Sequence, residues 1–198
     1  DLPAGPSEIL VLADKYSKPD LIALDILAQA EHDPHAKTYL VSTSKTLIQE
    51  VIQKIKETQK IHKFKNATES LKNFSYAILA KNSFEMFEIS NFIAPEHLHV
   101  HMKDSSQIEQ NIVNAGSVFI GEQNAVALGD YSIGTNHVLP TDQSARYSSG
   151  LGVDDFVKKT VFVKVGKKTF SKIANKTIEL AKSEGLDAHA LSIEIRAS

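Results

Sequence analysis

Short apolar runs and longer periodic segments alternate along the chain. An uninterrupted apolar run between polar flanks is typical of a strand that is buried on both faces, as in a parallel sheet. Segments in which apolar residues recur at i, i+3, i+4 and i+7 are typical of helices that pack one face on such a sheet. The apolar runs predict strands over 9–13, 38–41, 76–80, 98–101 and 117–120.

The segments between the predicted strands have helical features. Pro19 suits a first helical turn, where its missing N–H is not needed, and Ser44 suits the N-cap of the next helix. The predicted helices cover 19–32, 44–55, 83–92 and 106–114. Because parallel neighbours need crossover connections, this alternation predicts an α/β fold, a mostly parallel sheet with flanking helices over residues 1–155. Ligands are then expected at the carboxyl ends of the strands.

The alternation stops at residues 129–152, which are rich in Gly, Ser and Thr and have neither helical nor strand period. Ordered loops of this length are usually functional. Beyond the loop, the sequence predicts a β-rich stretch at 160–165, a helix at 169–183, a turn, and a last segment at 187–195. We expect residues 156–198 to form a small C-terminal helical appendage.

Composition and charge restrict the function. The 198 residues, 42% of them hydrophobic, are enough for one core. With 22 Lys and Arg against 24 Asp and Glu, the chain has no electrostatic reason to bind nucleic acid or an acidic membrane surface. No apolar run approaches the roughly 20 residues that cross a bilayer, so we expect a soluble, cytoplasmic protein. Because the chain begins at Asp1, directly before a strand-like run, we expect it to be part of a longer polypeptide.

The chain contains no cysteine. This excludes a disulfide scaffold, a thiolate nucleophile and any zinc site built on cysteine. A metal site would therefore have to use His, Asp, Glu or Gln.

Gln29 and His32 stand three positions apart near the end of the first predicted helix. At this spacing two side chains share a helix face and can offer two ligands to one metal ion. A polar helix end with a histidine near the negative pole of the helix dipole explains the same pattern.

Glu96 and His97 form an adjacent acid and base between a predicted helix and strand. A histidine that titrates near neutral pH and a neighbouring carboxylate can share proton transfer, although a solvated pair fits the sequence equally.

Asp130, at the start of the long loop, is a candidate third metal ligand or an Asx-turn or capping residue. His137 lies farther along this loop. Glu184 and His189 flank the last turn, and we expect ordinary surface or strand residues at His35, His62, His99 and His101.

Segments along the whole chain resemble, in order, those of the histidinol dehydrogenase family. The segment ALGDYSIGTNHVLPT (127–141) is the most specific of them. The others are GPSEILVLAD (5–14), ILAQAEHDP (26–34), APEHL (94–98), AGSVFIG (115–121), SSGLGVDDFVKKT (148–160) and EGLDAHA (184–190).

The resemblance implies a zinc-dependent homodimer that oxidises L-histidinol to L-histidine with two molecules of NAD, through an aldehyde. It implies that Glu96 and His97 are the catalytic acid/base pair. The implied zinc ligands are Gln29, His32, Asp130 and His189. The implied substrate contacts are Ser7, His97, His137, Glu184 and the four zinc ligands. Glu184 and His189 would reach the partner's site across the dimer.

Members of the family are much longer than this chain. The segment that they carry ahead of GPSE supplies a second nucleotide-fold domain and most NAD contacts. The resemblance therefore implies an incomplete nucleotide-fold-like domain with a dimer-forming tail, no NAD-binding residue in this chain, and no activity of the chain by itself. Two other functions stay open: a non-catalytic module that binds zinc or histidinol, and a metal-dependent hydrolase with Glu96 as base.

Overall fold

The computed structural model describes residues 5–134 and 136–197. These residues form two compact units, Asp1–Phe156 and Val157–Ser198, which we call the sheet unit and the helical unit. Among the described residues, no helix is long and apolar enough to span a membrane.

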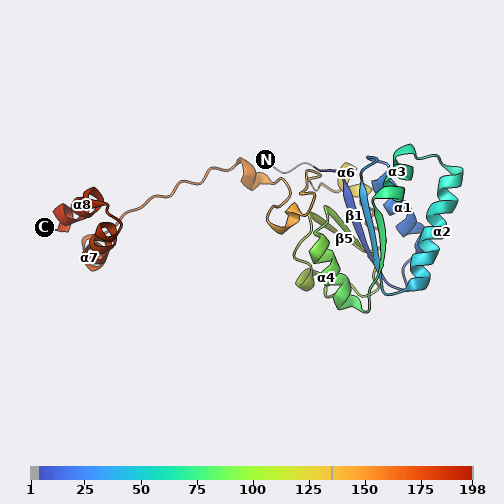
Figure 1. Ribbon diagram of the computed structural model, residues 1–198, viewed down its shortest axis with the longest axis horizontal. Helices are drawn as coiled ribbons and strands as arrows, with labels where there is room; N and C mark the ends of the chain where they lie inside the picture. Colours follow the sequence, from blue (N-terminus) through green and yellow to red (C-terminus); the bar gives the residue numbers. More distant parts are fainter. Residues whose placement is uncertain (1–4, 135, 198) are drawn as a thin grey trace. The chain divides into compact units, whose positions relative to one another are not determined.

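The sheet unit is built on five parallel strands in the order β3-β2-β1-β4-β5 (Figure 1). This confirms the predicted α/β fold and its parallel sheet. All six residues of β1 are buried, as its continuous apolar run indicates for a central strand. The strands are β1 (Glu8–Ala13), β2 (Lys37–Ser42), β3 (Ser75–Leu79), β4 (His97–Val100) and β5 (Ser117–Ile120).

Helices cover both faces of the sheet. On one face α1 (Pro19–Ala30) and α2 (Lys45–Ile61) pack on β1 and β2, and α3 (Lys65–Asn73) packs beside α1. On the other face lie α4 (Ser83–Ile93) and α5 (Ile108–Asn111).

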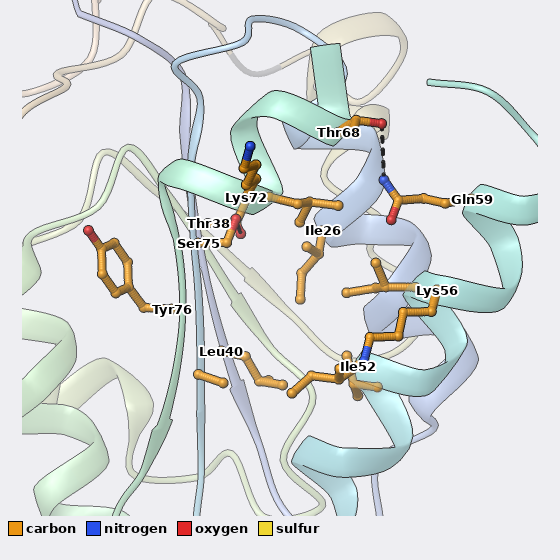
Figure 2. A pocket seen from close by; sticks show the side chains of 14 residues that line it. Ile26, Thr38, Leu40, Ile52, Lys56, Gln59, Thr68, Lys72, Ser75 and Tyr76 are labelled. Atoms are coloured by element: carbon orange, nitrogen blue, oxygen red, sulfur yellow. Dashed lines mark hydrogen bonds between the residues drawn. The ribbon is translucent and has the colours of Figure 1, made fainter. Parts of the chain in front are cut away.

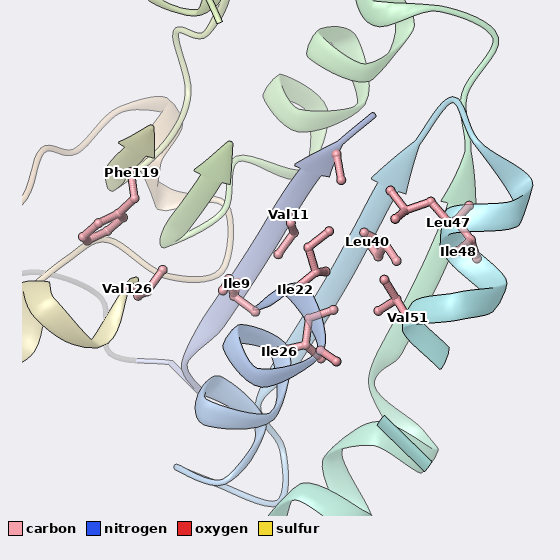
Figure 3. Packing of buried hydrophobic residues seen from close by; sticks show 12 residues of the cluster. Ile9, Val11, Ile22, Ile26, Leu40, Leu47, Ile48, Val51, Phe119 and Val126 are labelled. Carbon is pink, nitrogen blue, oxygen red and sulfur yellow. The ribbon is translucent and has the colours of Figure 1, made fainter. Parts of the chain in front are cut away.

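Alternate residues of β1 belong to different cores. Ile9 and Val11 face α1, where Figure 3 shows them beside Ile26 and Ile22. Leu10 and Leu12 face α4 and α5. The sheet is therefore the middle of three layers, and α1 returns along the face that carries Ile9 and Val11.

The structure confirms one predicted helix cap and adds one helix that the sequence did not predict. The hydroxyl of Ser44 accepts a hydrogen bond from the Leu47 amide at 3.2 Å, which confirms it as the N-cap of α2. The helix α3 was not predicted, because its nine residues bury only Ala67 and Ser70 and so show almost no apolar stripe.

The long segment at 129–152 contains more regular structure than expected. Its first residues complete the short helix α6 (Ala127–Tyr131), and Ser144–Arg146 form the 3-10 turn η1. A second 3-10 turn, η2 (Val153–Phe156), follows.

The prediction of a β-rich stretch at 160–165 is wrong. These residues form neither strand nor helix, and Phe162 is 92% exposed. High β-propensity reflects packing against a neighbouring strand, and the described part of the chain gives this segment none. The helical unit then consists of α7 (Lys167–Ser183) and α8 (Asp187–Ala197), joined by a turn in which Gly185 has a φ of 73°.

Candidate active site

Predicted site residues of the sheet unit lie at the amino-terminal edge of the sheet. His97 is the first residue of β4 and pairs with Ile9, the second residue of β1. In Figure 3, Ile9 lies at the tail of β1 beside Ile26, and Gln29 follows Ile26 along α1. The expectation of a site at the carboxyl ends is therefore wrong. Because α1 runs antiparallel to the strands, its last turn returns to the edge where they begin.

Glu96 and His97 form a buried, hydrogen-bonded pair. They are 7% and 6% exposed, so the alternative of a solvated pair is wrong. The Glu8 amide donates to Glu96 Oε2 at 2.8 Å, and His97 Nδ1 lies 3.1 Å from the Glu8 carbonyl oxygen. A carbonyl only accepts hydrogen bonds, so we assign the imidazole proton to Nδ1. The second nitrogen, Nε2, is then left as the base.

The surroundings of His97 favour its protonated form. Burial disfavours the imidazolium and acts to lower the pKa of His97. The Glu96 carboxylate, 3.4 Å from Nδ1, acts in the opposite direction with the Glu8 carbonyl and the negative charge of Asp130. Together they raise the pKa of His97 above its ordinary value, as suits a group that accepts a proton near neutral pH.

The backbone around Glu96 is fixed from both sides. The helix α4 ends at Ala94, which adopts a left-handed conformation with a φ of 51°. The Gly116 amide donates to the Pro95 carbonyl and the Ser117 amide to the Glu96 carbonyl, both at 2.9 Å. A Cβ atom at Gly116 would lie 2.5 Å from the Glu96 carbonyl oxygen. Glycine is required there so that the two chain segments can approach this closely.

An ion-pair network that the sequence reasoning missed supports the same edge. Lys37 Nζ lies 3.1 Å from Glu8 Oε1 and 2.8 Å from Asp142 Oδ1. Burial raises the pKa of Glu8 although Lys37 opposes this effect, and the two carboxylates raise the pKa of Lys37. The only sequence signals were two charged residues, Glu8 and Lys37, that stand directly before predicted strands.

Gln29 and His32 lie at the end of α1. Gln29 is 5% exposed, although neither atom of its amide is among the fully buried side-chain atoms that lack a partner in the described part of the chain. The helix ends at Ala30, and His32 is exposed in the turn that follows. The His32 amide donates to the Gln29 carbonyl at 3.3 Å, a 3-10 bond that places residues three apart on one side.

The other predicted site residues of the sheet unit differ in their positions. Asp130 is half-buried on α6, near enough to His97 to influence its pKa. It is not the cap of that helix, because the N-cap is Val126. Ser7 precedes β1 and is half-buried, whereas His137 is exposed in the loop.

Glu184 and His189 belong to the helical unit. Glu184 caps the carboxyl end of α7, and His189 is the third residue of α8. Both are exposed. Their carboxylate and imidazole are therefore open to a ligand or to another subunit.

The residues that the resemblance marks as zinc ligands offer an amide oxygen, a carboxylate and two imidazoles. This set of nitrogen and oxygen donors fits Zn²⁺. The chemistry of this donor set, together with the burial of Gln29, is what favours a ligand there.

A separate hollow of about 490 Å³ lies between α2, α3 and the β2–β3 side of the sheet (Figure 2). Its lining is mainly apolar, with a 3.5 Å hydrogen bond between Gln59 and Thr68 at one side. None of the predicted site residues lines it. The acid/base pair and this hollow are therefore distinct features.

Comparison with known proteins places this arrangement in a family. A family model described as histidinol dehydrogenase matches residues 1–197. The histidinol dehydrogenases of Clostridium acetobutylicum and Methanocaldococcus jannaschii are each 44% identical over 197 residues, which are 99% of this chain and 46% of either relative. The crystal structure of histidinol dehydrogenase from Elizabethkingia anophelis matches with a TM-score of 0.91 at 36% identity, and covers 99% of this chain and 45% of that one. The chain spans about half the length of the curated relatives it matches, and along that length it belongs to the histidinol dehydrogenase family.

Proposed function

We propose that the protein to which this chain belongs oxidises L-histidinol to L-histidine with NAD, through the aldehyde. Family membership supports this reaction, and the buried Glu96–His97 pair is the structural observation that carries it. A pair withdrawn from solvent and fixed by the backbone of Glu8 is suited to directed proton transfer.

His97 acts as the base in the alcohol step. With Nδ1 held by the Glu8 carbonyl, Nε2 takes the hydroxyl proton while the carbon gives up a hydride. NAD supplies the hydride acceptor. One alcohol thus becomes one aldehyde, with the proton on His97 and the hydride on NADH.

Glu96 acts in the aldehyde step. Its Oε2 accepts the Glu8 amide, which leaves Oε1 to accept a proton from the water that hydrates the aldehyde. The hydrate then gives a hydride to a second NAD and a hydroxyl proton to His97, which leaves the acid. The Glu8 backbone therefore holds the groups for both oxidations.

Gln29, His32, Asp130 and His189 would hold zinc, which when bound supplies a charge that orients the substrate nitrogens. Ser7, His137 and Glu184 complete the substrate contacts, and Ser7 adjoins Glu8 in the chain. Glu184 and His189 come from the partner in a homodimer, for which the helical unit provides the contact. We place the reaction in the cytoplasm and most NAD contacts in residues outside this chain.

The test is NADH formation by the full-length protein with L-histidinol and NAD, with His97→Asn as the control. We expect turnover in the range of about 1 to 1,000 per second, the common range for enzymes. The 198-residue chain alone should show negligible turnover while keeping weak affinity for histidinol. Binding of histidinol by the full-length protein without any NADH would instead identify a binding module.

A further inference from the structure

Two histidines and an aspartate cluster toward the carboxyl end of β4, away from the acid/base pair. His99 lies in β4, His101 follows its last residue, and Asp25 faces both from α1. One ligand atom from each of the three lies within 4.8 Å of the others. His99 and His101 are 0% and 4% exposed, and Asp25 is half-buried. The sequence predicted ordinary surface or strand residues here; His99 does lie in a strand, whereas His101 is buried just after it and not at the surface.

The hydrogen bond of His99 indicates which of its nitrogens is free. Its Nε2 lies 3.2 Å from the Gly121 carbonyl oxygen, which can only accept, so in the neutral ring Nε2 carries the proton. The lone pair of Nδ1 is then 3.0 Å from Asp25 Oδ2 and forms no hydrogen bond with any described residue. A lone pair and a carboxylate oxygen at this distance repel unless a cation lies between them.

His101 completes the same group. Its Nε2 is 3.0 Å from the Asp25 oxygen that His99 approaches, and the two imidazole centroids are 4.0 Å apart. Its Nδ1 is buried and has no hydrogen-bond partner in the described part of the chain. Buried polar atoms without a partner are rare in folded proteins, so Nδ1 of His99, which also faces the Asp25 carboxylate, indicates an absent ligand.

The cluster lies beside a cavity, although the imidazoles of His99 and His101 are themselves fully buried. A cavity of about 420 Å³ reaches His101 and is lined by Tyr16, His101, Met102, Lys103, Gly121 and Glu122. These residues follow the carboxyl ends of β1, β4 and β5. The chain reverses its direction of winding between the neighbours β1 and β4. The crevice at the carboxyl ends of such a pair is where α/β sheets commonly bind ligands.

We propose that Asp25, His99 and His101 bind a divalent transition-metal ion beside this cavity. Two imidazoles and one carboxylate suit Zn²⁺, Co²⁺ or Fe²⁺ and are a poor set for Mg²⁺ or Ca²⁺. The Gly121 carbonyl holds the outer nitrogen of His99, as acceptors do for metal-bound histidines. The site shares no residue with the zinc site proposed for the reaction, and it does not depend on that proposal.

The test first removes the zinc site that we propose for the oxidation of histidinol. In the 198-residue chain, His32→Asn and Asp130→Asn together delete two proposed zinc ligands of the reaction. We expect this double variant to keep one equivalent of Co²⁺, with a visible absorption band for nitrogen and oxygen ligands. Adding Asp25→Asn or His101→Gln should weaken binding at least about 100-fold, because loss even of a group that only supports a ligand costs 10- to 100-fold.

A matched control is Asp33→Asn, because Asp33 pairs with exposed His35 at 3.1 Å and so repeats the carboxylate–imidazole contact at the surface. It should leave Co²⁺ affinity unchanged. A folded double variant that binds no Co²⁺ overturns the proposal, as does binding that survives Asp25→Asn. Neither outcome bears on NADH formation by the full-length protein.

A second measurement needs no variant at the cluster. Nitrogen NMR of the unsubstituted chain with labelled histidine should show Nδ1 of His99 shifting when one equivalent of Zn²⁺ is added, while His35 stays unshifted. Unchanged His99 and His101 signals at saturating Zn²⁺ would refute the site. Because this measurement uses the unsubstituted chain, it decides the question even if the Asp25→Asn variant does not fold.

Discussion

The main-chain amide of Glu8 donates a 2.8 Å hydrogen bond to the carboxylate of Glu96, across 88 positions of sequence. The same residue accepts from His97 through its carbonyl oxygen. One peptide segment at the start of β1 therefore orients both members of the acid/base pair.

In the full-length protein, His97→Asn should depress both half-reactions by about 10² to 10⁴, the usual contribution of one acid/base group. The reason is that Nε2 is the proton acceptor in the alcohol step and assists the second step. Single-turnover NADH formation, started separately from histidinol and from the aldehyde, measures each effect. Zinc content should stay unchanged, and its loss would show that His97 is a ligand.

Glu96→Gln should slow the aldehyde-to-acid step by about 10² to 10⁴ while it largely spares the alcohol step. Hydration of the aldehyde is where a carboxylate base is needed, and glutamine keeps an oxygen to accept the Glu8 amide. The same two single-turnover experiments separate the steps. Equal losses in both would contradict the division of roles between the two residues.

Protonation of His97 should make stability depend on pH. The pKa of His97 is raised in the folded chain, so its contribution is fully present below the unfolded value of about 6.5. This contribution to the free energy of unfolding is lost as the pH rises through the pKa that His97 has in the folded chain. We expect urea midpoints to fall more for the wild-type chain than for His97→Asn between about pH 6 and about pH 9. Parallel curves for the two proteins would contradict the raised pKa.

Gly116→Ala should destabilise the sheet unit by about 1 to 3 kcal/mol, because its Cβ would meet the Glu96 carbonyl at 2.5 Å and force the segments apart. The measurement is urea unfolding. Gly152→Ala is the control in the same unit, since the nearest atoms to a Cβ there lie at 4.0 Å, an ordinary contact. Equal stability of the Gly116 and Gly152 variants would show that the close approach is not needed.

The strands could be predicted because burial on both faces leaves a direct mark, an unbroken apolar run such as that of β1. The helix α3 could not, since it buries little apolar surface. The stretch at 160–165 has the composition of a strand, but a strand also needs a neighbour, and composition does not supply one.

The site was only partly predictable for a related reason. Glu96 and His97 could be recognised because they are neighbours in the sequence. Their hydrogen bonds to the Glu8 backbone could not, because these depend on the pairing of β4 with β1. The cluster around Asp25 did leave a signal. In HLHVH, residues 97, 99 and 101 alternate with Leu98 and Val100, and alternate residues of a strand share a face. What the sequence did not show is that α1 places a carboxylate opposite that face.

In β4, histidines alternate with apolar residues, so the acid/base pair and the Asp25 cluster depend on the same strand register. Insertion of one residue just before His97 would turn Leu98 and Val100 to the face where His97 and His99 now lie. Both polar groups would then be lost in one event, although every side chain needed for them would still be encoded. Tolerance to length changes at this point should therefore be far lower than tolerance to substitution of any one of the three histidines.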